Sequence, residues 1–195
     1  MEFISENLKK IKPSPTMVIT AKARELKAKG ENVISLSSGE PDFDTPEHIK
    51  EAAIKAIHAG YTKYTNVEGI TELKEAIVKK FEIDNYIKYK SQEVIVGVGG
   101  KQILFNALLA TLNPKDEVII PTPYWVSYPD MTLLAGGKPI FINCSSETNF
   151  KLSGDDLEKV ITKNSKWLIL NSPSNPTGSC YSISELEEIA NVVRK

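Results

Sequence analysis

The sequence predicts an α/β fold in which a mostly parallel sheet carries helices on both faces. From Val94 onward, short apolar runs alternate with segments of helical spacing. That alternation is typical of chains that build a parallel sheet through helical crossovers. Runs such as residues 94–98 are continuously apolar, which indicates strands buried on both faces.

The N-terminal region is expected to form an arm followed by a helix. Residues 1–15 are polar and contain two prolines, a composition that favours an exposed arm. A helix is predicted from Thr16, whose hydroxyl can cap it, to Gly30, a common helix stop. A short strand is expected at residues 33–36.

Two amphipathic helices are predicted next. Thr45-Pro46-Glu47 is a typical helix start, with a hydroxyl cap and then a proline whose missing N–H costs nothing in the first turn. Apolar residues follow at helical spacing in the first helix (Ile49, Ala52, Ala53, Ala56, Ile57) and in the second (Ile70, Leu73, Ile77, Phe81).

Strands and helices alternate in the rest of the chain. The expected strands cover residues 94–98, 117–120, 139–142 and 167–170, and the expected helices run over 101–112, through Met131, from Ser153, and from Ser182. Ser182-x-x-Glu185 forms a capping box for the last helix, with Leu186, Ile189, Ala190 and Val193 inward. No strand follows that helix, so a strand–helix–strand unit is left open and we expect a truncated domain.

Composition excludes several classes of function. There are 24 basic and 25 acidic residues, a net charge of −1, which gives no reason to expect nucleic acid or a membrane surface as a partner. Cys144 and Cys180 lack metal-ligand spacing and are expected to be reduced, and the two histidines, His48 and His58, suggest no metal site. Without a leader sequence or an apolar stretch of about 20 residues, we expect a cytoplasmic protein.

A glycine-rich turn is the first candidate site. Gly97, Gly99 and Gly100 lie where a predicted strand gives way to a helix, a place that suits a phosphate because backbone N–H groups and the helix dipole meet there. Gln102 breaks both the dinucleotide fingerprint and the P-loop pattern, which disfavours a nucleotide-binding module. A phosphate cup of another kind and a tight turn that needs glycine both stay open.

Two further loops follow predicted strands. Trp125 could offer a flat face to a planar ring, or serve as a core aromatic residue. Asn175 lies in the rigid loop 171–178, where it could bind a ligand or close a turn of its own loop. In a parallel sheet, loops after the strand carboxyl ends line the ligand crevice.

The order of these segments resembles one family along essentially the whole chain. The segments are Gly39-Glu40-Pro41-Asp42-Phe43-Asp44-Thr45-Pro46, Lys63-Tyr64-Thr65 with Gly69, Gly99-Gly100-Lys101-Gln102, Pro123-Tyr124-Trp125, and Asn175-Pro176-Thr177-Gly178. Together they resemble the class I/II pyridoxal-phosphate (PLP) aminotransferases of fold type I. Lys12-Pro13-Ser14 with Thr16, and Tyr124-Trp125-Val126-Ser127-Tyr128-Pro129, are similar to the bacterial aspartate aminotransferase branch, some members of which also use prephenate.

The resemblance implies a set of roles. Gly99, Gly100, Lys101 and Gln102 would hold the cofactor phosphate, Trp125 would stack on the pyridine ring, and Asn175 would bond the ring's phenolic oxygen. Trp125 and Asn175 also face the substrate, Gly39 would bring its amide near the substrate α-carboxylate, and Lys101 with Thr16 and Lys12 would receive a distal carboxylate. Tyr64 would reach the phosphate in a neighbouring subunit, which implies a homodimer with shared active sites.

The resemblance also implies what this chain lacks. The Schiff-base lysine, the acid at the ring nitrogen and the arginine for the α-carboxylate are all expected beyond Lys195, so no catalytic residue is expected here. Lys166, a partial match to the lysine motif, is interpreted as a surface residue. Residues 1–45 are assigned to the arm and a small-domain segment, and residues 46–195 to the N-terminal part of the PLP-binding large domain.

The expected function is therefore that of an aspartate aminotransferase. It would transfer the amino group of L-aspartate to 2-oxoglutarate, and this chain alone would be inactive. The alternatives are a PLP-dependent carbon–sulfur lyase of the same fold and a truncated gene product without function.

Overall fold

The computed structural model of the chain describes residues 3–37 and 39–195. These residues form two compact units. One comprises Gly99–Lys195 together with the N-terminal segment that ends at Lys12, and the other comprises Pro13–Val98. The domain boundary predicted between residues 45 and 46 stays a prediction.

The first unit is built around a three-stranded parallel sheet. Its strands are β1 (Glu117–Thr122), β2 (Lys138–Asn143) and β3 (Ser165–Leu168), in the order β2-β1-β3. The predicted parallel sheet is thereby confirmed, and the strand expected at 167–170 begins two residues earlier. Central β1 is the most buried of the three because it alone has a strand on each side.

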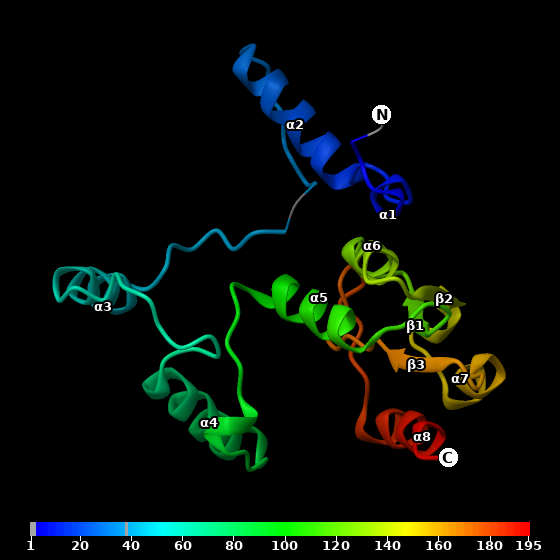
Figure 1. Ribbon diagram of the computed structural model, residues 1–195. Helices are drawn as coiled ribbons and strands as arrows, with labels where there is room; N and C mark the ends of the chain where they lie inside the picture. Colours follow the sequence, from blue (N-terminus) through cyan, green and yellow to red (C-terminus); the bar gives the residue numbers. More distant parts are fainter. Residues whose placement is uncertain (1–2, 38) are drawn as a thin grey trace. The chain divides into compact units, whose positions relative to one another are not determined.

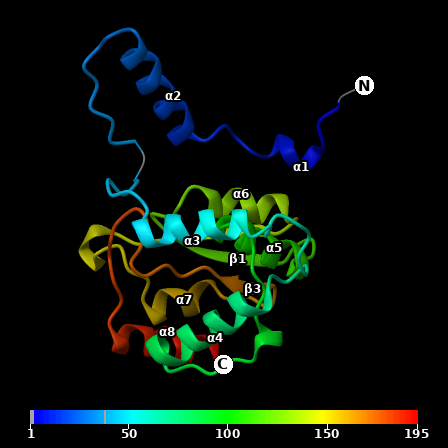
Figure 2. The same cartoon turned by 90° about the vertical axis from the view of Figure 1, so that its left-hand side faces the viewer.

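Helices cover both faces of this sheet, as predicted (Figure 1). Side chains alternate along a strand, so Val118 and Ile120 of β1 pack on one face and Ile119 on the other. The first face meets α5 (Gly100–Thr111) and α6 (Ser127–Leu134), and the second meets α7 (Gly154–Val160) and α8 (Ile183–Val193). Figure 2 shows the same layers from the side, with α6 above β1 and with α7 and α8 below it.

Helix α8 confirms its predicted cap but only part of its predicted inner face. The Ser182 hydroxyl accepts the Glu185 N–H, and the Glu185 carboxylate accepts the Ser182 N–H, which completes the capping box. Ile189 is buried, whereas Leu186 is 40% exposed and Val193 is 59% exposed. The prediction was wrong for these two residues because α8 buries only a narrow stripe, centred on Ile189, against α7 and the sheet.

The second unit contains three longer helices at the predicted places. They are α2 (Pro15–Ala28), α3 (Glu47–His58) and α4 (Thr71–Asn85). The short helix α1 (Glu6–Lys9), within the predicted arm, belongs to the first unit. Both predicted caps were wrong by a residue or two. Thr16 lies inside α2, since Pro15 already has a φ compatible with the first turn. Pro46 rather than Thr45 precedes α3, because its ψ of 139° is not helical.

Two predicted strands are wrong. Residues 33–36 and 94–98 form no strand, although Val94 is extended. An extended segment becomes a strand only beside a second strand that exchanges backbone hydrogen bonds with it. Val96 instead donates its N–H to the Glu68 carbonyl at 3.0 Å, and Ile95 and Val98 are 64% and 88% exposed.

Short 3₁₀ turns at Ser91–Glu93 and Ser146–Thr148 complete the regular structure. Within the described ranges, no helix has both the length and the apolar character needed to cross a membrane.

Candidate functional site

Three of the predicted segments meet at the carboxyl edge of the sheet in the first unit. Trp125 follows the carboxyl end of β1, and the Lys101 ammonium at the start of α5 lies 4.9 Å from the centre of its ring. At the opposite end of the same helix, Trp167 of β3 donates its indole N–H to the Thr111 hydroxyl at 2.9 Å. Helix α5 therefore runs antiparallel to the strands, with its amino end at their carboxyl edge.

The amino end of α5 forms an open cup. Gly99 precedes the helix with φ 81° and ψ 160°, a conformation that only glycine adopts easily. A Cβ placed on Gly99 or Gly100 would meet no atom within 4 Å, so there is free space in front of the first helical turn. The helix dipole and the cation of Lys101 both favour an anion at this place.

The Trp125 ring is held from two helices. It lies half-buried against the core, where it contacts the side chains of Lys101 of α5 and Tyr128 of α6. The Trp125 and Tyr128 rings meet edge to face, with centroids 5.4 Å apart and an angle of 86°. The Tyr128 N–H also donates to the Trp125 carbonyl at 3.0 Å. Trp125 is thus both a core aromatic residue and a flat surface at the sheet edge.

The Asn175 loop is closed by a residue that sequence reasoning missed. The side-chain oxygen of Asn171 accepts the Asn175 N–H at 2.8 Å, so Asn171 rather than Asn175 closes this turn. Asn175 itself is exposed. The signal was present in the sequence, because an asparagine directly after an apolar strand commonly hydrogen-bonds the backbone a few residues on.

A small cavity connects this loop to the one that follows β1. Its volume is about 20 Å³, and it is lined by Pro123, Tyr124, Tyr128, Asn171 and Asn175 among others. That is room for about one water molecule. A planar aromatic ring is therefore too large for this cavity.

The residues at this edge fit a phosphorylated aromatic ring in charge and in shape. The open glycine cup and Lys101 suit the phosphate, and the exposed part of Trp125 suits the ring. The amide of Asn175 stands at the rim of the same edge. The roles of the individual residues stay predictions.

The other predicted site residues are divided between the two units. Lys12 is exposed and belongs to the first unit. Thr16, Gly39 and Tyr64 belong to the second unit, where Tyr64 is fully exposed and Gly39 is exposed.

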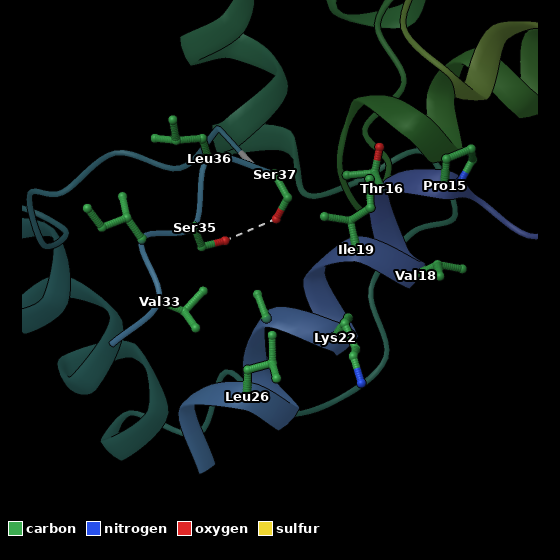
Figure 3. A pocket seen from close by; sticks show the side chains of 12 residues that line it. Pro15, Thr16, Val18, Ile19, Lys22, Leu26, Val33, Ser35, Leu36 and Ser37 are labelled. Atoms are coloured by element: carbon green, nitrogen blue, oxygen red, sulfur yellow. Dashed lines mark hydrogen bonds between the residues drawn. The ribbon is translucent and has the colours of Figure 1, made fainter. Parts of the chain in front are cut away.

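Thr16 lines an apolar groove within the second unit (Figure 3). The groove lies between α2 and residues 33–37 and has a volume of about 680 Å³. Ile19, Leu26 and Val33 line its walls. Ser37 hydrogen-bonds Thr20 at 3.0 Å and Ser35 at 3.1 Å, which holds the segment beside the helix.

Lys166 lies at the opposite edge of the sheet from the candidate site. Its ammonium pairs with the Asp116 carboxylate at 3.0 Å. Hydrogen bonding from the Asn113 backbone and from Lys166 holds the pKa of Asp116 below its usual value. Lys166 is thus a surface residue, as predicted. Cys144 is buried, Cys180 is exposed, and both are free thiols, also as predicted.

Comparison with known proteins agrees with this arrangement. The sequence pattern of the family described as aminotransferase class I and II matches residues 31–195. The chain is 62% identical over all 195 residues to a probable aspartate/prephenate aminotransferase of Rickettsia bellii, and 59% identical to the aspartate/prephenate aminotransferase of Cereibacter sphaeroides. It covers 49% of each of these relatives, so the chain spans about half the length of the curated relatives it matches.

A solved structure extends the likeness to the fold. Aspartate aminotransferase from Thermus thermophilus with maleate matches the whole chain with a TM-score of 0.96 and 45% identity. The match covers 51% of that protein.

Proposed function

Because this chain belongs to the class I and II aminotransferase family, we propose that the protein carrying it transfers the amino group of L-aspartate to 2-oxoglutarate, giving oxaloacetate and L-glutamate. Prephenate is a second amino acceptor in this proposal. Both substrates follow the names of relatives that are about 60% identical to this chain.

One observation carries the proposal: the amino end of α5, Trp125 and the Asn175 loop meet at one carboxyl edge of the sheet. The family is PLP-dependent. When bound, PLP supplies an electron sink for the carbanion that forms at the α-carbon of an amino acid. The protein has to hold the phosphate, orient the ring and select the substrate.

The residues at the edge divide this work. The backbone amides at Gly99, Gly100, Lys101 and Gln102 bind the phosphate, where the helix dipole favours an anion. Trp125 stacks on the ring and fixes its plane, and the side-chain amide of Asn175 donates to the ring's phenolic oxygen. Each of these groups stands on the first unit, so they form one half-site together.

The substrate is a dicarboxylate in this proposal. Lys101 carries the cation that pairs with a distal carboxylate. Thr16, Lys12 and the amide of Gly39 keep the substrate-binding roles that the resemblance to the family implies. The Thermus relative was solved with maleate, a dicarboxylate, which supports a substrate of this type. A dicarboxylate specificity separates this proposal from a carbon–sulfur lyase of the same fold.

The working form is a homodimer with shared active sites. The Tyr64 side chain is fully exposed, in a segment where Thr62 and Lys63 border the same open hollow. An exposed tyrosine of this kind can reach the phosphate in a second copy of the chain. The lysine, the acid and the arginine that complete the reaction come from the remainder of the protein, and the 195-residue chain by itself turns over no substrate.

The decisive experiment is a substrate panel on the complete gene product that carries this chain. With PLP present, aspartate and 2-oxoglutarate should yield oxaloacetate, and replacing 2-oxoglutarate by prephenate should keep turnover. Release of pyruvate and a thiol from cystathionine, with no amino transfer, would establish the lyase instead. The 195-residue chain serves as the matched sample without turnover.

A further inference from the structure

Tyr128 is the most firmly held aromatic residue next to the candidate site. Its side chain is 8% exposed and lies in the core with Leu108 and Met131. Its N–H donates to the Trp125 carbonyl, and its own carbonyl accepts the hydroxyl of fully buried Thr132 at 2.9 Å. Backbone and ring are therefore fixed from several sides.

The Tyr128 ring touches both parts of the proposed cofactor site. It meets the Trp125 indole edge to face, a geometry that aromatic rings prefer because the positive ring edge faces the negative ring face. It also lines the small cavity that Asn171 and Asn175 line from the other loop. Because the Tyr128 side chain is packed in the core and lies next to both loops, it can restrict the movement of both.

The Tyr128 side chain is uncharged where it contacts the Trp125 indole. Burial raises the pKa of Tyr128, so its phenol stays neutral through the pH range in which an aminotransferase is assayed. The other contact of the indole, with Lys101, comes from a long and flexible side chain on α5. Of the two, only Tyr128 is anchored well enough to set the plane of the ring.

We infer that Tyr128 is a positioning residue that fixes the plane of the Trp125 indole, and thereby the orientation in which a planar heteroaromatic ring is received. The identity of that ring as PLP rests on the proposed function. The orientation of the indole does not, since it is a property of the chain without ligand.

The first test reads the indole directly. Both tryptophans, Trp125 and Trp167, are labelled with 5-fluorotryptophan, and Trp→Phe variants assign the two ¹⁹F resonances. Tyr128→Leu should shift and broaden the Trp125 resonance and spare that of Trp167, whereas Tyr128→Phe, which keeps the aromatic ring, should restore the wild-type spectrum. Thr111→Val is the matched control, because it removes the hydrogen bond of Trp167 and should move only that resonance.

The second test separates positioning from a general structural role. Tyr128→Leu should weaken the binding of PLP to the chain about two- to tenfold, the range of one edge-to-face contact. The binding of inorganic phosphate, which needs only the α5 cup, should stay unchanged. Where Tyr128→Leu does not fold, Tyr128→Met provides the same comparison, because methionine fills irregular gaps without an aromatic edge.

Two results would overturn the inference. One is a Trp125 resonance that does not move in a folded Tyr128 variant, and the other is an equal loss of affinity for PLP and for phosphate. A wild-type chain that binds phosphate but no PLP would count against the proposed cofactor alone, since the ¹⁹F spectra would still decide whether Tyr128 orients the indole.

Discussion

Gly99 shows at the scale of one residue how the backbone prepares an anion site. Its φ of 81° with ψ of 160° lies in a region that is essentially restricted to glycine. Gly100 beside it is the first residue of α5, and its φ is not positive. A Cβ added to either glycine would meet no neighbouring side chain or loop within 4 Å. The two positions therefore differ in backbone conformation and not in the room available for a side chain.

Gly99→Ala should therefore lower the free energy of unfolding by about 1–3 kcal/mol, entirely from backbone strain. Gly100→Ala is the matched control and should leave stability unchanged or raise it by up to about 1 kcal/mol, because alanine favours a helix. Urea unfolding followed by circular dichroism measures both. Equal effects of the two substitutions would show that strain at residue 99 does not exist in solution.

Lys101 is the residue on which the proposed substrate selectivity depends. Lys101→Met in the complete protein should raise the KM for aspartate roughly tenfold or more, since a hydrogen bond to a charged group contributes about 1.5–3 kcal/mol. The KM for alanine, which has no distal carboxylate, should hardly change. Steady-state kinetics with both amino acids provides the measurement.

Lys166→Met is the control for that experiment, because Lys166 pairs with Asp116 at the other edge of the sheet. It should change neither KM. If Lys101→Met affected aspartate and alanine equally, Lys101 would act on the cofactor or on Trp125 rather than on the distal carboxylate.

At the scale of elements, the sequence predicted every helix of more than seven residues and the three strands of the described sheet. It also predicted that Lys101, Trp125 and Asn175 lie at one edge of the sheet, because the carboxyl ends of parallel strands meet at the same edge. The prediction of a strand at 94–98 was wrong. An apolar run indicates that a segment is buried, whereas a strand also requires a neighbouring strand to share backbone hydrogen bonds. Asn171 was missed although it directly follows an apolar strand, because the same loop also contains Asn175 and the sequence does not show which of the two asparagines closes the turn.

An ion pair fastens α8 to the loop before α7, and its energy depends on pH. The Lys151 ammonium contacts the Glu185 carboxylate, and chiefly this contact lowers the pKa of Glu185 from 4.5 to about 2. A carboxyl group with a lowered pKa stabilises the fold fully above its unfolded value and loses that contribution as the pH falls to the folded value. The relevant window is therefore pH 4.5 down to about 2.

Lys151→Met should flatten the fall of the unfolding free energy across that window and lower stability at pH 7. The matched control is Lys195→Met, which removes the solvent-exposed pair between Lys195, two residues after α8, and Glu158 of α7. Exposed pairs contribute little, so this control should keep the wild-type profile. Urea unfolding at a series of pH values measures the unfolding free energy of both variants. Identical pH profiles for Lys151→Met and wild type would show that the pair does not contribute to stability in acid.

At the scale of the whole molecule, the two units differ in how much apolar surface they leave open. In the first unit both faces of the sheet are covered by helices. In the second, no apolar side chain of α3 is buried, and Ile49, Ile54 and Ile57 are each at least half exposed. Large exposed apolar patches mark surfaces that bind other protein segments.

The chain alone should consequently self-associate through α3. Ile54→Lys with Ile57→Lys should reduce that association, because it places two charges in the apolar stripe without touching a core contact. Exchanging Glu51 and Lys55 on the same helix keeps both the net charge and the stripe, and is the matched control. Sedimentation velocity over a concentration series measures the association. A double lysine variant that sediments like wild type would place the adhesive surface elsewhere, with the groove between α2 and residues 33–37 as the next apolar surface to test.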